Sequence, residues 1–106
     1  MIKPLVVLPQ VEFDLRNGSA WYELQARGLG EEFQRTFYST LSELQRNPAM
    51  FQIVFGDYRR RTMGKFPYAI YYFIEDERIV VASLFHSSRD PLALFNILKN
   101  RREGER

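Results

Sequence analysis

The chain lacks cysteine, and its 106 residues include only one histidine and one tryptophan. Without cysteine the protein can form no disulfide, thiolate nucleophile or thiolate metal site. With one histidine it cannot form a metal site with two histidine ligands. No apolar run approaches the roughly 20 residues that cross a membrane, and the prolines near the N-terminus do not suit a secretory signal. We therefore expect a cytoplasmic protein with no membrane contact.

The residues that are present indicate a globular protein. Hydrophobic residues make up 45% of the chain and aromatic residues 15%, and the aromatic residues are mostly Phe and Tyr. A chain of this length buries roughly 60–70% of its unfolded surface, which is enough for one modest core. We predict a single domain over residues 1–106, ordered over about 3–98, with a flexible charged tail over 99–106.

The formal net charge of +2 hides an uneven distribution. Residues 1–57 carry five Lys or Arg and seven Asp or Glu, whereas residues 58–106 carry ten and six. The basic C-terminal half is the side on which we expect an acidic partner to bind, either nucleic acid or an acidic protein segment. The alternative is a charged face that only contacts solvent.

The N-terminal half predicts one strand followed by two helices. The strand covers residues 3–8, where Leu and Val lie between two prolines. From Val11 onward apolar residues recur every three or four positions, which indicates a helix that ends in the glycine-containing segment 27–30. The next helix is expected to have Gly30 as its N-cap and to stop before Pro48. Its buried stripe is predicted to be Phe33, Phe37, Leu41 and Leu44.

The C-terminal half predicts a sheet. Residues 49–57 suggest a packed loop, and strands follow at residues 58–63, 68–74 and 79–85. Because no helix separates these strands, we expect antiparallel hairpins. The dipeptide Asp90-Pro91 is typical of a helix start. The predicted fold class is α+β: an N-terminal strand, a two-helix hairpin packed on an antiparallel sheet of about four strands, and a short C-terminal helix.

Few residues could carry out catalysis. The sequence has no Gly-rich phosphate loop, nucleophile elbow or metal-ligand spacing. His86, at the end of a predicted strand, could act as a general acid or base, although a lone histidine is more often structural. We predict no cofactor and no metal.

The three consecutive arginines at 59–61 form the densest positive charge. Side chains alternate between the two faces of a strand, so Arg59 and Arg61 share one face, with Lys65 and Arg89 expected nearby. Such a cluster suits phosphate or carboxylate oxygens, which arginine binds in pairs. The spacing alone does not decide between those two ligands.

Short motifs follow one another along the chain in a characteristic order. They are Asp14-Leu15, Ala20-Trp21-Tyr22-Glu23, Gly28-Leu29-Gly30-Glu31-Glu32-Phe33, Asn47-Pro48, Arg61, Phe66-Pro67-Tyr68-Ala69-Ile70-Tyr71-Tyr72 and His86-Ser87-Ser88-Arg89-Asp90-Pro91. This set resembles the RelE/ParE superfamily of toxins from type II toxin–antitoxin modules, also called plasmid stabilisation proteins. The likeness covers about residues 3–95. It implies a strand, a helical hairpin and then an antiparallel sheet, in agreement with the periodicity.

The superfamily divides into two activities. ParE-like members poison DNA gyrase and cleave nothing themselves, and the segments Phe66-Pro67-Tyr68 and Arg89-Asp90-Pro91 resemble that branch. RelE-like members are ribosome-dependent mRNA endonucleases that use basic residues and often a Tyr or His near the C-terminus. Where such a nuclease would carry the tyrosine, this chain has Leu94 and Phe95. Gly64 stands where a nuclease would carry an arginine. The resemblance therefore favours gyrase inhibition, with no catalytic residue.

Each activity implies its own set of working residues. The residues expected to contact gyrase are Arg59, Arg61, Arg89 and Phe95. A metal-independent ribonuclease acting on mRNA at the ribosome would instead use Arg61, Lys65, His86 and Arg89. A third alternative is a member that binds its antitoxin and harms nothing. In each case the resemblance implies a small antitoxin as partner, which would lay an amphipathic or extended acidic segment over the toxin.

Overall fold

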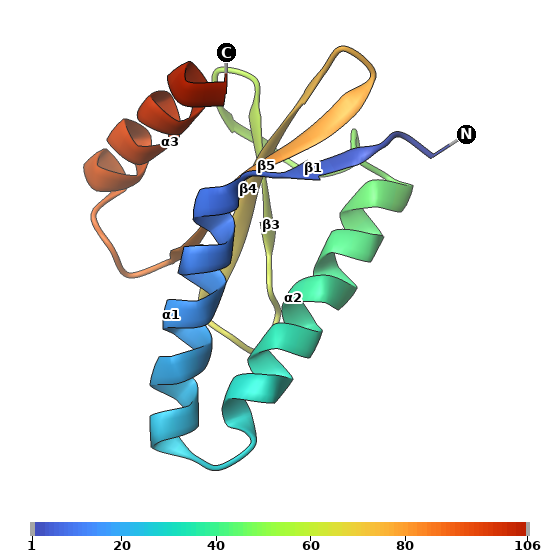
Figure 1. The fold of residues 1–106 in the computed structure, drawn as a ribbon. Helices are drawn as coiled ribbons and strands as arrows, with labels where there is room; N and C mark the ends of the chain where they lie inside the picture. The colour runs from blue at the N-terminus through green and yellow to red at the C-terminus, as the bar shows by residue number, and fades with distance from the viewer. Residues whose placement is uncertain (1, 106) are drawn as a thin grey trace.

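The computed structural model describes residues 2–105, and within this range the chain forms five strands and three helices (Figure 1). Their bounds are β1 Leu5–Val7, α1 Pro9–Gln25, α2 Leu29–Arg46, β2 Ile53–Phe55, β3 Tyr58–Thr62, β4 Tyr68–Glu75, β5 Arg78–His86 and α3 Pro91–Glu105. The predicted α+β class is confirmed. Among the described residues, 2–105, no helix combines the length and the hydropathy of a membrane span.

The strands form one sheet in the order β1-β5-β4-β3-β2. β1 runs parallel to β5, and every other neighbouring pair is antiparallel. The turn between β4 and β5 contains Asp76 and Glu77 with φ of 54° and 59°, the backbone that two-residue hairpin turns prefer. β4 and β5 are buried along most of their length, which explains their continuous apolar sequences.

The segment 49–57, predicted to be a packed loop, contains a fifth strand. Ile53–Phe55 forms β2 at the edge of the sheet and pairs with β3. β-branched and aromatic residues favour an extended backbone, and Gly56, with φ of 54°, permits the tight turn that follows. Three residues are too few to show a strand period in the sequence, which is why the pattern did not reveal β2.

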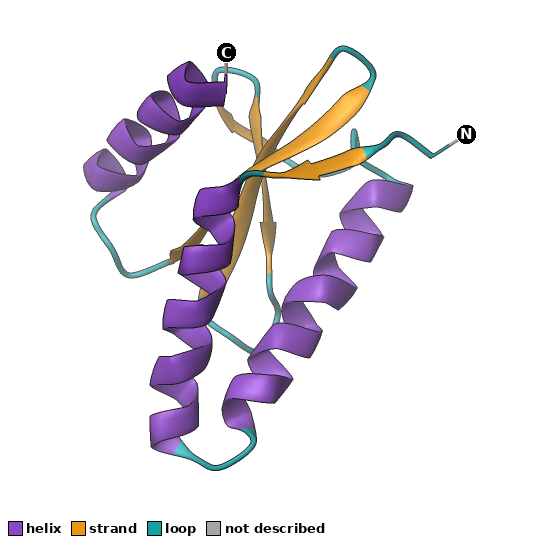
Figure 2. Cartoon of the chain, viewed as in Figure 1, coloured by secondary structure: helices purple, strands orange, loops and turns teal. Residues whose placement is uncertain are grey.

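The helical hairpin and α3 lie against opposite faces of the sheet (Figures 1 and 2). On one face, the Phe33 ring of α2 packs edge-on against Tyr68 of β4 at 4.9 Å between centroids. On the other face, the Tyr58 hydroxyl of β3 donates a hydrogen bond to the Leu98 carbonyl of α3 at 3.2 Å. The hairpin thus covers one face, while α3 leaves part of the other face open.

The predicted stripe of α2 is confirmed, and it forms the hairpin side of the core. Its four buried residues are Phe33, Phe37, Leu41 and Leu44. Gly18 of α1 lets the two helices approach closely, because a Cβ at this position would lie 2.7 Å from the Phe33 ring. The helix propensity lost at Gly18 is therefore offset by close packing against a fully buried aromatic ring.

The N-terminus of α2 is capped from α1. Gly28, and not the predicted Gly30, is the N-cap, and its φ of 86° is one that glycine adopts readily. The Glu23 carboxylate accepts hydrogen bonds from the Gly28 N–H and from the Gly30 N–H, both at 3.0 Å. These bonds satisfy backbone donors that a helix start leaves unpaired, and negative charge is favourable there.

The last helix is longer than predicted. The Asp90 carboxylate accepts the Leu92 N–H at 3.0 Å, so the predicted helix start is confirmed. The helix was expected to end near residue 98, but α3 continues through residues 99–105 of the predicted tail. The sequence pattern missed this extension because the added residues are mostly charged and show no apolar period.

Ion pairs hold the extension of α3 against the sheet. The Arg102 guanidinium binds the carboxylate of Asp57 at 2.6 Å and that of Glu75 at 3.1 Å, and it lies 3.6 Å from the centroid of the Phe73 ring. These contacts stabilise the C-terminal end of α3, which its own residues would not keep helical in isolation. Residue 106, the last of the predicted tail, lies outside the described residues.

Candidate functional site

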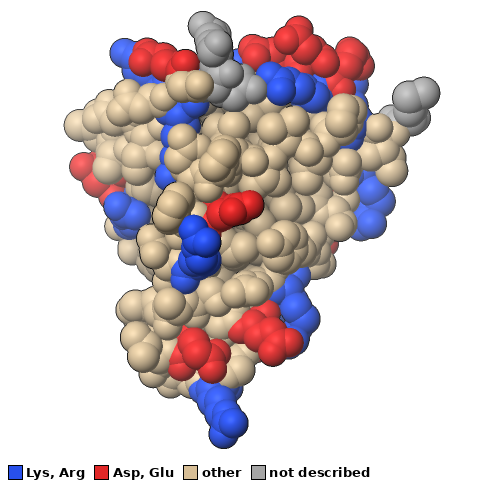
Figure 3. Space-filling view, in the orientation of Figure 1, with Lys and Arg blue, Asp and Glu red and all other residues tan. Residues whose placement is uncertain are grey.

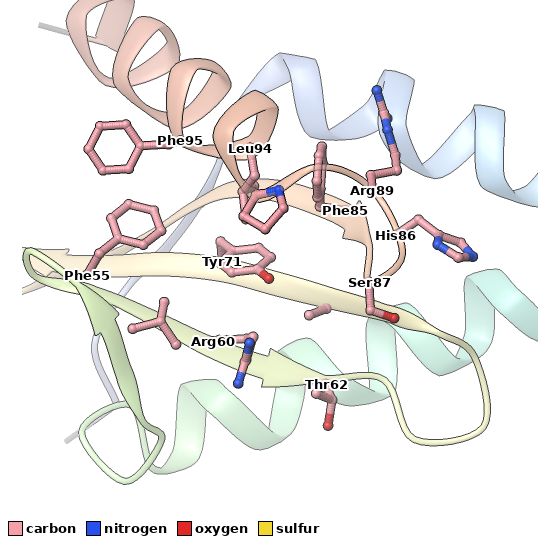
Figure 4. Close-up of a pocket in the computed structure, with 13 residues that line it drawn as sticks. Phe55, Arg60, Thr62, Tyr71, Phe85, His86, Ser87, Arg89, Leu94 and Phe95 are labelled. Atoms are coloured by element: carbon pink, nitrogen blue, oxygen red, sulfur yellow. The ribbon is translucent and has the colours of Figure 1, made fainter.

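A groove runs along the open part of the sheet face that carries α3 (Figure 4). We call it the α3 groove; it has a volume of about 320 Å³. The start of α3 forms one side, and β2 and β3 form the other. Its apolar surface comes from Val54, Phe55, Tyr71, Phe85, Leu94 and Phe95. An apolar groove of this kind, open to solvent, is suited to bind another molecule.

Arg60 supplies positive charge on the β3 side of the α3 groove. It lies directly opposite Tyr71 in the register between β3 and β4, so both side chains are on the groove face. Arg60 is exposed, and within residues 2–104 its side chain pairs with no acidic residue. Its guanidinium therefore keeps its five N–H donors available for another molecule.

Arg89 supplies a second cation from the loop between β5 and α3. Its guanidinium lies 4.7 Å from the centroid of the Phe85 ring, which is a cation–π contact. The neighbouring Asp90 carboxylate is used to cap α3. Arg89 is exposed and has no ion pair in the part of the chain that the structure describes. The α3 groove thus carries two arginines without a counterion among the described side chains.

Phe95, another predicted contact residue, also lies in the α3 groove. Its side chain is 46% exposed, and its ring packs against Phe55 of β2 with 5.0 Å between centroids. The structure therefore brings Phe95 and Arg89, which were both predicted to contact the target, into one surface.

Arg59 and Arg61, the other two predicted contact residues, lie on the opposite face, beside α2. Arg59 donates hydrogen bonds to the carbonyls of Ala49 at 3.0 Å and Phe51 at 2.8 Å. Arg61 pairs with the Glu43 carboxylate of α2 at 2.6 Å. Both side chains thus fasten neighbouring segments to the sheet.

The four residues of the ribonuclease alternative fall into two groups. Arg61 and Lys65 line a hollow beside α2, where Lys65 pairs with Glu32. The Lys65 hydrogen bond lowers the pKa of the Glu32 carboxyl, so this lysine has a carboxylate partner within the protein. His86 and Arg89 line a different hollow, at the end of β5. The geometry thus does not gather the four residues around one reacting group.

The described residues do not assemble a metal site. No group of three or more His, Asp or Glu side chains lies close enough to hold a metal ion between residues 2 and 105. The α3 groove is lined by arginines and aromatic rings, and also by His86, Ser87 and Thr62.

A protein-family model matches residues 5–91, and it is described as the ParE toxin of type II toxin–antitoxin system, parDE. The match spans the whole of the described sheet and the helical hairpin. The chain belongs to the ParE toxin family. It is thus a toxin component of a type II toxin–antitoxin module, and the family implies an antitoxin partner. A search of curated proteins finds no matching relative.

Arg60 is the residue of this ParE-family chain that sequence reasoning did not select. Strand alternation correctly separated Arg60 from Arg59 and Arg61, and the two that share a face were preferred. The acidic residues of α2 were the signal that could have favoured Arg60 over Arg59 and Arg61. Glu32 and Glu43 lie on the helix that covers the sheet, so cations on that face find partners inside the protein.

Proposed function

We propose that this ParE-family toxin inhibits DNA gyrase by binding it through the α3 groove, with Arg60, Arg89 and Phe95 as contact residues. One observation carries the proposal: two arginines that pair with no acidic side chain of residues 2–104 flank an apolar surface that these residues leave uncovered. Exposed aromatic residues and arginines are the side chains that most often carry binding energy at protein interfaces.

The same groove supports binding better than it supports chemistry. An arginine stays protonated in proteins, so Arg60 and Arg89 can hold an anionic group but cannot exchange a proton with it. His86, the one histidine of the chain, also lines the groove, but of the basic residues predicted to act with it only Arg89 lies beside it. A protein that holds its target without cleaving it needs no more than the groove provides.

The antitoxin implied by the family would be expected to compete for this surface. A segment with acidic residues and apolar side chains is complementary to two free arginines beside an apolar groove. Such a segment would keep the toxin from reaching gyrase while it is bound.

A supercoiling assay with purified toxin, DNA gyrase, ATP and relaxed plasmid tests the proposed function. We expect the toxin to abolish supercoiling and to leave linear DNA trapped when the reaction is stopped with denaturant. Normal supercoiling in the presence of folded toxin in excess over gyrase would contradict the proposal.

One observation favours ribosome-dependent mRNA cleavage as a second candidate. The His86 ring lies 5.0 Å from that of Tyr68, and Arg89 lines the same hollow, so a proton carrier and a phosphate-binding cation are neighbours. If this candidate is correct, His86→Ala removes mRNA cleavage on translating ribosomes and removes toxicity. Full toxicity of His86→Ala would exclude His86 as the proton carrier.

A further inference from the structure

The hollow that His86 and Arg89 line lies between α1 and the end of β5. It has a volume of about 310 Å³ and is lined by Trp21, Tyr68, His86, Ser88 and Arg89. Ligand pockets in proteins range from about 300 to 1,000 Å³, so this hollow has room for one small ligand. Trp21 has no role in gyrase binding or in mRNA cleavage as proposed above.

Trp21 offers an open aromatic face to this hollow. The side chain is 55% exposed, and its ring meets Tyr22 edge-on, with 5.0 Å between centroids and an interplanar angle of 89°. Single exposed apolar residues are common on protein surfaces and need no ligand. Trp21 differs from them because it borders a hollow in which three polar side chains also lie.

The polar side chains of the hollow present hydrogen-bond donors. His86 Nδ1 accepts the Ser88 N–H at 3.0 Å, so the neutral imidazole carries its proton on Nε2 and can donate it. The Arg89 guanidinium has no ion pair within residues 2–105. In Figure 4 the Arg89 side chain extends toward α1, the helix that carries Trp21.

The hollow also lacks negative charge. No Asp or Glu of residues 2–104 lines it. The nearby Asp14 carboxylate is occupied by Arg101, with which it forms two hydrogen bonds at 2.7 and 3.0 Å. An anionic ligand would therefore meet donors and a cation without a lining carboxylate to repel it.

We infer that this hollow binds a nucleotide with a terminal phosphate, and this goes beyond gyrase inhibition. The base stacks on Trp21, as bases do on exposed aromatic side chains, and the phosphate accepts hydrogen bonds from Arg89 and His86. A free nucleoside monophosphate and the phosphorylated 5′ end of a single strand carry this same chemistry.

Trp21 is the one tryptophan of the chain, so its fluorescence reports on this site directly. We expect adenosine 5′-monophosphate to quench the fluorescence in a saturable way, and adenosine to bind about tenfold more weakly or worse. A 5′-phosphorylated dinucleotide is titrated in parallel. Tighter binding of the mononucleotide assigns a free nucleotide, and tighter binding of the dinucleotide assigns a strand end. Absence of saturable quenching and of binding heat with both would overturn the inference.

Variants of Arg60 and Trp21 separate this site from the α3 groove, because Arg60 lines only the groove and Trp21 only the hollow, whereas Arg89 lines both. Arg89→Gln should weaken nucleotide binding by about tenfold or more, whereas Arg60→Gln, which removes the same charge outside the hollow, should leave it unchanged. Calorimetry of the Trp21→Leu variant should show weaker nucleotide binding. This variant should still inhibit gyrase. Unchanged nucleotide affinity in either Arg89→Gln or Trp21→Leu, with the fold intact by circular dichroism, would overturn the inference.

Discussion

Arg59 and Arg60 are neighbours in the chain, yet they have different surroundings because side chains alternate along β3. Arg59 points toward the loop before β2 and donates hydrogen bonds to two of its carbonyls. Arg60 points into the α3 groove, where no acidic side chain of residues 2–104 meets it. The first arginine is expected to matter for stability and the second for binding.

Gly18 provides a test of the packing between α1 and α2. In Gly18→Ala the new Cβ would lie 2.7 Å from the fully buried Phe33 ring, so the ring or the helix must move. We expect the free energy of unfolding to fall by about 1–3 kcal/mol, measured by urea denaturation.

Gly104→Ala is the matched control, because a Cβ there meets nothing within 4 Å. This substitution in α3 should leave stability unchanged or raise it by up to about 1 kcal/mol. Equal effects of the two substitutions would show that backbone propensity, and not contact with Phe33, accounts for the role of Gly18.

The buried Tyr72 hydroxyl leads to a prediction of how the free energy of unfolding changes at alkaline pH. Burial raises the pKa of its hydroxyl to about 12, with Arg59 opposing the shift, and the hydroxyl donates to the Pro48 carbonyl at 2.7 Å. As the pH rises from about 10 to 12, the unfolded tyrosine ionises while the folded one stays neutral. The free energy of unfolding should therefore fall over this window, by up to about 2 kcal/mol from Tyr72 alone.

Tyr72→Phe removes this contribution and should make the loss of stability between pH 10 and 12 shallower. At neutral pH the variant should lose about 1 kcal/mol with the hydrogen bond to Pro48. Part of the slope should remain, because burial also raises the pKa of three other hydroxyls: Tyr22, Tyr58 and Tyr68. Identical slopes for the two proteins would contradict this account of Tyr72.

At the scale of elements, α1 and α3 together complete the open edge of β5. β1 ends at Val7, whose partner in β5 is Val81, so β5 continues past its neighbouring strand. The Asp14 carboxylate of α1 accepts the Leu84 N–H at 3.1 Å, and Arg101 of α3 donates to the Ala82 carbonyl at 2.8 Å. The ion pair between Asp14 and Arg101 thus replaces part of a missing strand.

Asp14→Ala should lower the free energy of unfolding by about 2–3 kcal/mol, because it leaves the Leu84 N–H and the mostly buried Arg101 guanidinium without their partner. The double variant with Arg101→Ala should lose less than the sum of the two single losses. The exposed pair between Glu31 and Arg35 is the control, and Glu31→Ala should cost below about 0.5 kcal/mol. Additive losses at residues 14 and 101 would contradict the coupling.

For the whole molecule, most of the fold could be predicted from periodicity. The step of three and four from Phe33 to Leu44 defined α2, and Asp90-Pro91 defined the start of α3. β2 and the end of α3 could not be predicted in this way. Their structures depend on contacts between residues far apart in the sequence, such as that of Arg102 with Asp57.

The candidate site could be predicted only in part, for a related reason. Arg89 and Phe95, which the sequence predicted as contact residues, both line the α3 groove, and their contact with gyrase stays a prediction. The sequence could not show which face of β3 would find acidic partners, and so it favoured Arg61 over Arg60. Which face of β3 finds acidic partners depends on where α2 places Glu32 and Glu43.

The distribution of charge over the folded protein is more even than the two halves of the sequence suggest. On the face seen in Figure 3, Lys and Arg are interspersed with Asp and Glu. Ion pairs such as that of Arg61 with Glu43 join the basic half to the acidic half. Net charge by sequence segment therefore says less about partner binding than the few cations that remain unpaired.

The most direct test of this account compares two double variants in the gyrase supercoiling assay. Arg60→Gln/Arg89→Gln removes the two unpaired arginines of the α3 groove, and Arg27→Gln/Arg46→Gln removes the same charge at exposed positions elsewhere. With both proteins folded, the first should need about tenfold more toxin or worse to block supercoiling, and the second should match the wild type. Equal inhibition by the two variants would contradict the claim that the α3 groove binds gyrase.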